Sequence, residues 1–113
     1  MRNLKINEIT ISVEIAANQE QRMKGLSGRN NLPEKQGMLF AHDKPRIIRI
    51  WMKDMRFALD IIWIDENFKI VHIENNIWPD SFPKIFLSPQ PAKYILEVNA
   101  GFTEKHNIKI GDE

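Results

Sequence analysis

The sequence contains no cysteine, and this absence excludes disulfide scaffolds, thiolate zinc sites and cysteine nucleophiles. Its 16 basic and 15 acidic residues nearly cancel, so it lacks the basic surplus that duplex nucleic acid or an anionic membrane surface demands. No apolar run approaches the roughly 18 residues that cross a bilayer. We therefore expect no nucleic-acid partner and no membrane span.

Signals for cofactors and metals are also missing. The few glycines form no phosphate-binding loop, because Gly25 and Gly28 lack the flanking Lys-Ser/Thr of that motif. The three histidines, His42, His72 and His106, are scattered rather than closely spaced, so we predict neither a metal site nor a cofactor. The first residues carry no apolar core of a signal peptide. The chain as given is expected to be cytoplasmic, or exported if a leader was removed.

What the sequence has in abundance is isoleucine, 17 residues against 6 alanines. Branching at Cβ favours a pleated surface over a helix, so strands are expected to dominate. Residues 8–15 alternate apolar and polar side chains, which predicts a half-buried strand with its isoleucines and Val13 toward the core. A length of 113 residues indicates one domain, residues 1–113.

Further strands are predicted along the chain, at residues 37–41, 47–52, 60–64, 68–74 and 94–98, with a terminal stub at 108–110. Asn18 and Gln21 have the spacing of a capping box, which predicts a short helix that ends at Gly25 or Gly28. Residues 99–107 allow a second helical turn. The fold class is therefore mainly β with a minor α part: a small, mostly antiparallel sheet or barrel-like domain with one or two short helices.

Trp51 and Lys53 lie two apart on a predicted strand, so their side chains leave the same face. If residues 54–59 form a hairpin loop, Lys53 pairs across with Asp60, and a three-residue turn after Ile64 then brings His72 beside Asp60. Such a polar trio at the end of an apolar face is typical of ligand pockets. The alternative, which is the more frequent arrangement, is a cross-strand salt bridge with a solvated histidine.

Glu97 interrupts the apolar strand at residues 94–98, where an unpaired carboxylate is unfavourable. We expect a partner such as Arg22, Arg29 or Lys53. A structural ion pair is the commoner explanation, and a ligand-binding carboxylate is the alternative.

Residues 75–91 contain four prolines and the tryptophan Trp78, which favours a long loop. We expect this loop to act as a lid over a site, and the indole of Trp78 to be a candidate for stacking on a ligand.

Several segments taken together resemble one family. They are Arg22-x-x-Gly25-Leu26-x-x-Arg29, Leu32-Pro33-x-x-x-Gly37-Met38-Leu39-Phe40, Trp51-Met52-Lys53-x-Met55, Leu59-Asp60-Ile61, Pro91-Ala92, Leu96-Glu97-Val98-Asn99-Ala100-Gly101 and Gly111-Asp112. In this order and spacing they resemble the domain of unknown function 192 family (DUF192, UPF0127), found in prokaryotes. The resemblance implies a compact β-rich single domain with no established reaction, and many relatives look exported. It places Trp51, Lys53, Asp60 and Glu97 within the family's motifs and leaves His72 outside them.

Three functions remain open at this point. The first is a module that binds a small polar or sugar-like ligand. The second is a protein-interaction or accessory domain, and the third is a hydrolase-like enzyme that uses Asp60 or Glu97 as general acid or base. The enzyme requires a carboxyl group with a pKa raised by burial and no countercharge beside it. The candidate ligand-binding residues are Arg29, Trp51, Lys53, Asp60, His72 and Glu97.

Overall fold

The computed structural model describes all 113 residues, most of whose regular structure is β. Along the chain the elements are β1 (Arg2–Ile6), β2 (Ile9–Ala16), α1 (Gln19–Lys24), β3 (Gln36–Arg46), β4 (Arg49–Ile50), β5 (Leu59–Ile64), β6 (Ile70–Ile77), the 3-10 turn η1 (Pro79–Ser81), β7 (Phe86–Leu87), β8 (Ala92–Asn99) and α2 (Phe102–Lys105). Neither α-helix has the length or the apolar character needed to span a membrane.

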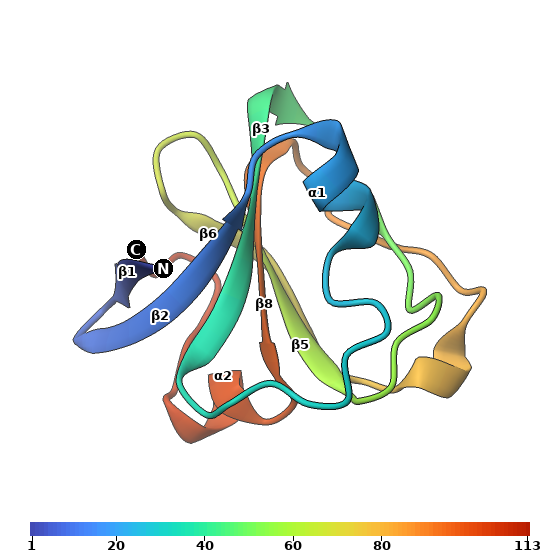
Figure 1. Ribbon diagram of the computed structural model, residues 1–113. Helices are drawn as coiled ribbons and strands as arrows, with labels where there is room; N and C mark the ends of the chain where they lie inside the picture. The colour runs from blue at the N-terminus through green and yellow to red at the C-terminus, as the bar shows by residue number, and fades with distance from the viewer.

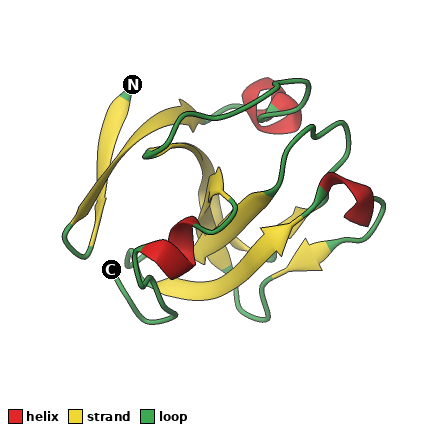
Figure 2. Ribbon diagram, turned by 90° about the horizontal axis from the view of Figure 1, so that it is seen from below, coloured by secondary structure: helices red, strands yellow, loops and turns green.

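Six strands form one twisted, mixed sheet in the order β1-β2-β3-β8-β5-β6 (Figure 1). All neighbours in it run antiparallel except β2 and β3, which are parallel and are joined by a crossover that contains α1. The short strands β4 and β7 pair separately from this sheet (Figure 2). The predicted fold class, mainly β with a mostly antiparallel sheet and two short helices, is confirmed.

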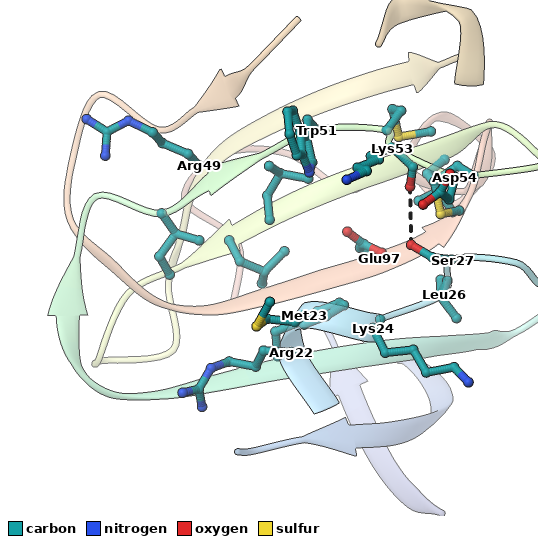
Figure 3. Close-up of a pocket in the computed structure, with 18 of the residues that line it drawn as sticks. Arg22, Met23, Lys24, Leu26, Ser27, Arg49, Trp51, Lys53, Asp54 and Glu97 are labelled. Carbon is teal, nitrogen blue, oxygen red and sulfur yellow. Dashed lines mark hydrogen bonds between the residues drawn. The ribbon is translucent and has the colours of Figure 1, made fainter. Parts of the chain in front are cut away.

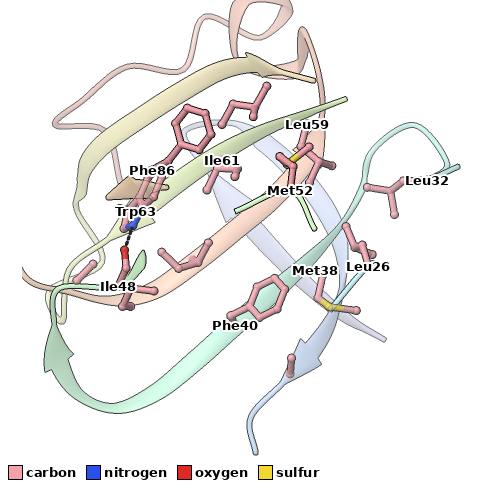
Figure 4. Close-up of a cluster of buried hydrophobic side chains, with 14 residues drawn as sticks. Leu26, Leu32, Met38, Phe40, Ile48, Met52, Leu59, Ile61, Trp63 and Phe86 are labelled. Carbon is pink, nitrogen blue, oxygen red and sulfur yellow. Dashed lines mark hydrogen bonds between the residues drawn. The ribbon is translucent and has the colours of Figure 1, made fainter. Parts of the chain in front are cut away.

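The central strands β5 and β8 are covered on both faces of the sheet. Successive side chains of a strand point to opposite faces, so each strand contributes to two separate cores. Ile61, Trp63 and Ile95 belong to the core that Figure 4 shows, whereas Ile62 and Leu96 belong to the core on the other face. Every residue of β5 is buried, which explains its nearly unbroken apolar sequence.

Gly37 allows β3 to lie close against β8 at the position of Glu97. A Cβ atom added at Gly37 would lie only 2.7 Å from the backbone carbonyl oxygen of Glu97 and 3.0 Å from a methyl group of Val98. Any larger residue would therefore push the two strands apart. This glycine fixes the backbone from which the Glu97 side chain projects.

The helix α1 begins and ends as its sequence predicts. The Asn18 side chain accepts a hydrogen bond from the Gln21 amide (2.8 Å), and the Gln21 side chain reaches back to the Asn18 amide. Gly25 ends the helix with a positive φ of 50°, and a side chain there would press on the ring of Phe40. This capping holds a very short helix in a defined place over the sheet.

Four local predictions were wrong. The segment 75–91 is not one long loop, since β6 continues to Ile77 and Phe86–Leu87 form β7. Residues 47–52 do not form a full strand, since β4 has two residues and Lys53 lies in a turn after it. The β5–β6 turn is longer than three residues because the Asp65 side chain accepts hydrogen bonds from the amides of Asn67 and Lys69 (2.9 Å each), so Ile64 pairs with Ile70. Residues 108–110 form no strand.

Candidate functional site

A cleft of about 790 Å³ lies on the face of the sheet that carries α1. One wall is α1 and the loop after it, and the other is the chain segment that runs from β4 to Met55 (Figure 3). Met23 and Trp51 stand on opposite walls, and the Glu97 side chain from β8 projects into the space between them. The volume lies within the range of about 300–1,000 Å³ that small-molecule sites occupy.

In the wall that carries Trp51 and Lys53, more buried and more exposed residues alternate, although only two residues of this segment form a strand. Ile48 and Met52 are buried in the core, so Trp51 and Lys53 are turned outward on the same side. The buried indole of Trp63 fixes the start of this segment by donating a hydrogen bond to the Ile48 carbonyl oxygen (3.0 Å; Figure 4). The sequence-based expectation that Trp51 and Lys53 share a face is therefore confirmed.

The two walls are joined at one end of the cleft. The Ser27 hydroxyl donates to the Lys53 carbonyl oxygen (3.2 Å; Figure 3), and the Gly28 amide donates to the Asp54 carbonyl oxygen (2.9 Å). These bonds connect the loop after α1 with the turn after β4, two segments that are distant in sequence. They fix the position of one wall relative to the other at this end of the cleft.

Trp51 is 47% exposed, and one side of its indole packs on Phe82 with ring centroids 5.0 Å apart. Phe82 belongs to the segment 75–91, which was expected to act as a lid. No residue of that segment lines the cleft. It supports Trp51 from outside, and Trp78 is 63% exposed away from the site. The expectations of a lid and of stacking by Trp78 at this site are therefore wrong.

Glu97 is the most unusual group of the cleft. The residue is 6% exposed, its side chain lines the cleft, and its carboxyl group forms no hydrogen bond or ion pair with another residue. Burial raises the pKa of Glu97 to about 7. The expected ion-pair partner is absent, since no lysine, arginine or histidine nitrogen lies within 4.0 Å of its carboxyl group.

The proposed partners of Glu97 are engaged elsewhere or too distant. Arg22 donates to the backbone oxygens of Ala17 (2.8 Å) and Ala41 (2.9 Å), and in Figure 3 its side chain points away from Glu97. Arg29 forms a bidentate ion pair with Glu14, with nitrogen–oxygen distances of 2.5 and 2.9 Å. Arg29 does not line the cleft, and its guanidinium connects the loop after α1 to β2.

The predicted pairing of Lys53 with Asp60 and His72 is wrong. Asp60 pairs with Val98 and Ile61 pairs with Glu97, so Asp60 and Glu97 point to opposite faces of the sheet. Asp60 is fully buried beside α2, where its carboxyl oxygens accept bonds from the amides of Asn76, Gly101 and Thr103 and from the Thr103 hydroxyl. It therefore cannot reach a ligand in the cleft.

His72 is also remote from the cleft. It lies opposite Trp63 in the sheet, with ring centroids 5.2 Å apart, and its Nε2 is 2.8 Å from a carboxylate oxygen of Glu74. Among the sequence-predicted residues, the structure thus brings together Trp51, Lys53 and Glu97 and separates Arg29, Asp60 and His72 from them. The structure brings together no group of three or more acidic and histidine side chains that would hold a metal ion.

Most residues that line the cleft were not predicted, and among them are Met23 on α1 and His42 on β3. Burial, with Arg22 and Arg46 nearby, lowers the pKa of His42, so its ring is neutral at pH 7. The sequence did hold one signal for the α1 wall, because the matched segments at 22–29 and 51–55 both contribute lining residues. That segments 22–29 and 51–55 line the same cleft becomes apparent only in the folded structure, where they form opposite walls.

Comparison with known proteins identifies the family. A search of curated proteins found no match. A crystal structure from Sinorhizobium meliloti, described as that of a candidate transcription regulator, has a TM-score of 0.88 and 34% identity, covering 92% of this chain and 80% of that one. A protein of unknown function from Novosphingobium aromaticivorans has a TM-score of 0.88 and 28% identity, covering 93% and 74%. The model of family DUF192, described as "Uncharacterized ACR, COG1430", matches residues 2–113, and the chain therefore belongs to this family.

Proposed function

We propose that the protein binds a small, polar, sugar-like ligand in the cleft between α1 and the segment that follows β4. The observation that carries this proposal is the Glu97 carboxyl group, which is buried at the cleft and has no partner within the protein. A buried polar group is unfavourable unless it is hydrogen-bonded, so such a group in a cleft favours a partner from outside the chain. The hydroxyl groups of a sugar are suitable donors to a carboxyl oxygen.

The walls of the cleft can contact the less polar surface of a sugar, which its C–H groups form. The half-exposed indole of Trp51 offers an aromatic face, whose partial negative charge attracts the polarised C–H groups of a sugar ring. Met23 on the opposite wall is 78% exposed and can adapt to different ligand shapes. Phe82 packs against the indole in a tilted arrangement and limits its movement, so little conformational freedom is lost when a ligand stacks on it.

Trp51→Ala is expected to weaken sugar binding about tenfold or more, because it removes the stacking surface. Trp78→Ala is the matched control, since Trp78 is also exposed but lies outside the cleft. Titrating the isotope-labelled protein with a panel of hexoses, followed by NMR, measures both affinities. Binding that perturbs the amides of α1 and residues 49–55 supports the proposal. Equal losses in the two variants, or shifts confined to residues outside the cleft, would contradict it.

A second candidate is a hydrolase that uses Glu97 as general acid or base, and the specific observation in its favour is the pKa of about 7 without a countercharge. Hydrolases of glycosides commonly use two carboxyl groups, and Asp54 is the only other one that lines the cleft. Asp60 is not available for this role, since it lies on the other face.

Nitrophenyl glycosides test the enzyme directly. Hydrolysis is expected to follow the titration of one group with an apparent pKa near 7 and to be lost in Glu97→Gln. Asp54→Asn distinguishes a two-carboxyl mechanism, because it should also abolish turnover. Binding of a sugar without turnover at any pH between 5 and 9 would leave the binding module as the function.

The remaining alternatives have less support. The side chains of Trp78, Ile85 and Leu87 are exposed, as an interaction domain would require, but none of them lines the cleft that contains Glu97. The Sinorhizobium meliloti relative is described as a candidate transcription regulator, and that description applies to that protein alone. For this chain the near balance of 16 basic and 15 acidic residues continues to favour a small ligand over nucleic acid.

A further inference from the structure

Positive charge is concentrated around the cleft although the whole chain is almost neutral. Five basic residues line it, Arg22, Lys24, Arg46, Arg49 and Lys53, against the two acidic residues Asp54 and Glu97. The four ion pairs of the structure involve none of these seven side chains. The basic groups of the cleft are therefore not neutralised by contacts within the protein, and their combined field favours ligands of negative charge.

Lys53 is the basic residue best placed to meet a ligand. Its Nζ atom lies 5.6 Å from the centroid of the Trp51 ring, and in Figure 3 it is turned toward the space above Glu97. The ammonium group donates no hydrogen bond to the protein, and no carboxylate oxygen is within 4.0 Å of it. Contact with the indole limits the positions that this long side chain adopts, which makes it a more defined binding group than a free lysine.

Lys53 and Glu97 therefore face the same space, close enough to share one ligand and too far apart to satisfy each other. A ligand that contacts both needs hydrogen-bond donors at one end and a negative group at the other. A cationic ligand would satisfy Glu97 but would be repelled by the basic residues around the cleft. A neutral sugar would use Glu97 and Trp51 and would leave the ammonium group in water.

We propose that the ligand is an anionic sugar, such as a hexuronic acid or a hexose phosphate, with its ring on Trp51, its hydroxyl groups at Glu97 and its negative group on the Lys53 ammonium. This inference rests on the proposed function and specifies its ligand class. The carboxylate and the phosphate share the same chemistry toward Lys53, namely charge-assisted hydrogen bonds from an ammonium group. The preference between them is decided by the titration below.

Matched pairs of probes test the proposal by isothermal titration at pH 6 and low salt, where Glu97 is mostly protonated and repels no anion. The pairs are glucose with glucuronate, galactose with galacturonate, and glucose with glucose 6-phosphate. At least one acid is expected to bind about tenfold tighter than its parent sugar, a ratio typical of one charge-assisted hydrogen bond. Raising the salt concentration should reduce this ratio.

Lys53→Met keeps the length of the side chain and its contact with Trp51 but removes the charge. It is expected to bring the ratio of affinities close to one by weakening the binding of the acid, and Lys53→Arg should retain the preference. Lys84→Met is the matched control, because Lys84 lies 5.0 Å above the ring of Phe86 but does not line the cleft. Circular dichroism confirms that each variant is folded.

The possible results separate the two proposals. If the acids and their parent sugars bind equally well, the anionic ligand class is wrong and the sugar-binding function stands. If the acids bind more tightly but Lys53→Met keeps the preference, the role of Lys53 is wrong. If no probe of either kind binds to the folded wild type, the proposed function itself is overturned.

Discussion

The variant Glu97→Gln is expected to unfold at a temperature about 10 °C higher than the wild type at pH 8. The reason is the difference between the pKa of Glu97 in the folded protein, about 7, and its ordinary value of 4.5. Each unit corresponds to about 1.4 kcal/mol, so keeping this carboxylate ionised in the folded state lowers the free energy of unfolding by about 3 kcal/mol. Glutamine has nearly the same shape and never ionises.

The sign of the effect follows from which state releases the proton first. Below pH 4.5 the group is protonated in both states, so the substitution should change the stability little. Between pH 4.5 and 7 the unfolded chain releases the proton while the folded chain retains it, so the stability of the wild type falls as the pH rises. Above pH 7 the penalty is complete. The advantage of the variant should therefore be small at pH 5 and full at pH 8.

Thermal and urea unfolding of both proteins between pH 5 and pH 8 measure this difference. Glu14→Gln is the matched control with the opposite sign, because the hydrogen bond from Arg29 lowers the pKa of Glu14. That variant should be slightly less stable than the wild type by the same amount from pH 5 to pH 8, because the deficit is lost only below pH 4.5, as the pH falls through the lowered pKa of Glu14. A stability difference for Glu97→Gln that does not vary with pH would show that Glu97 is not desolvated in the folded protein.

The same substitution is expected to weaken binding in the cleft. At pH 8 the carboxylate of Glu97 offers two oxygens that can accept ligand hydroxyl groups, whereas the glutamine amide presents only one acceptor. The Glu97→Gln variant should therefore be more stable than the wild type but bind more weakly. This combination is expected when a residue serves function and destabilises the folded state. A variant that is stabilised at pH 8 but binds sugars as tightly as the wild type would separate Glu97 from the site.

Asp60→Ala is expected to lower the free energy of unfolding by about 3–5 kcal/mol, the largest loss for any single side chain considered in this protein. Asp60 is fully buried and accepts four hydrogen bonds, at 2.8 Å from Asn76, 3.2 Å from Gly101, and 2.9 and 2.8 Å from Thr103. Alanine would leave three amides and one hydroxyl group without their acceptor. The N-cap residue of α2 is Gly101, which has no side chain, so the start of the helix would lose the only carboxylate that accepts bonds from its amides.

Urea unfolding measures this loss, and two further variants locate it. Asp60→Asn keeps one acceptor oxygen and should lose less than alanine, and Thr103→Val should lose only the hydroxyl contact. Because a small domain has a total stability of about 5–15 kcal/mol, the alanine variant should still be folded at low temperature. There it should bind sugars as the wild type does, since Asp60 faces away from the cleft. A loss below about 1 kcal/mol would contradict the structural role of Asp60.

The contrast between Asp60 and Glu97 shows how far sequence reasoning reached. Both are acidic residues in apolar strands, and both were sensible candidates for a site. Alternation within each strand was predicted correctly, but the pairing of Asp60 with Val98 and of Ile61 with Glu97 was not. A change of pairing by one residue exchanges the faces of a strand, so this register decides which acid reaches the cleft.

Local signals determined the elements themselves. The alternation of residues 8–15 predicted most of β2, the spacing of Asn18 and Gln21 predicted the start of α1, and the strand predicted at residues 60–64 is the greater part of β5. The motif around Trp51 and Lys53 marked one wall of the cleft. These features depend on neighbours within a few residues, where backbone geometry alone decides which side chains meet.

Tertiary structure decided the rest. Lys53 faces Glu97 only because Ser27 and Gly28 bind the turn after β4, and Glu97 is unpaired only because Arg22 and Arg29 are engaged by distant parts of the chain. The sequence by itself determined which groups were available and on which side of each segment they lie. Which of them meet in one cleft, and which is left without a partner, was decided by long-range packing, because contacts between residues tens of positions apart have no local periodicity to reveal them.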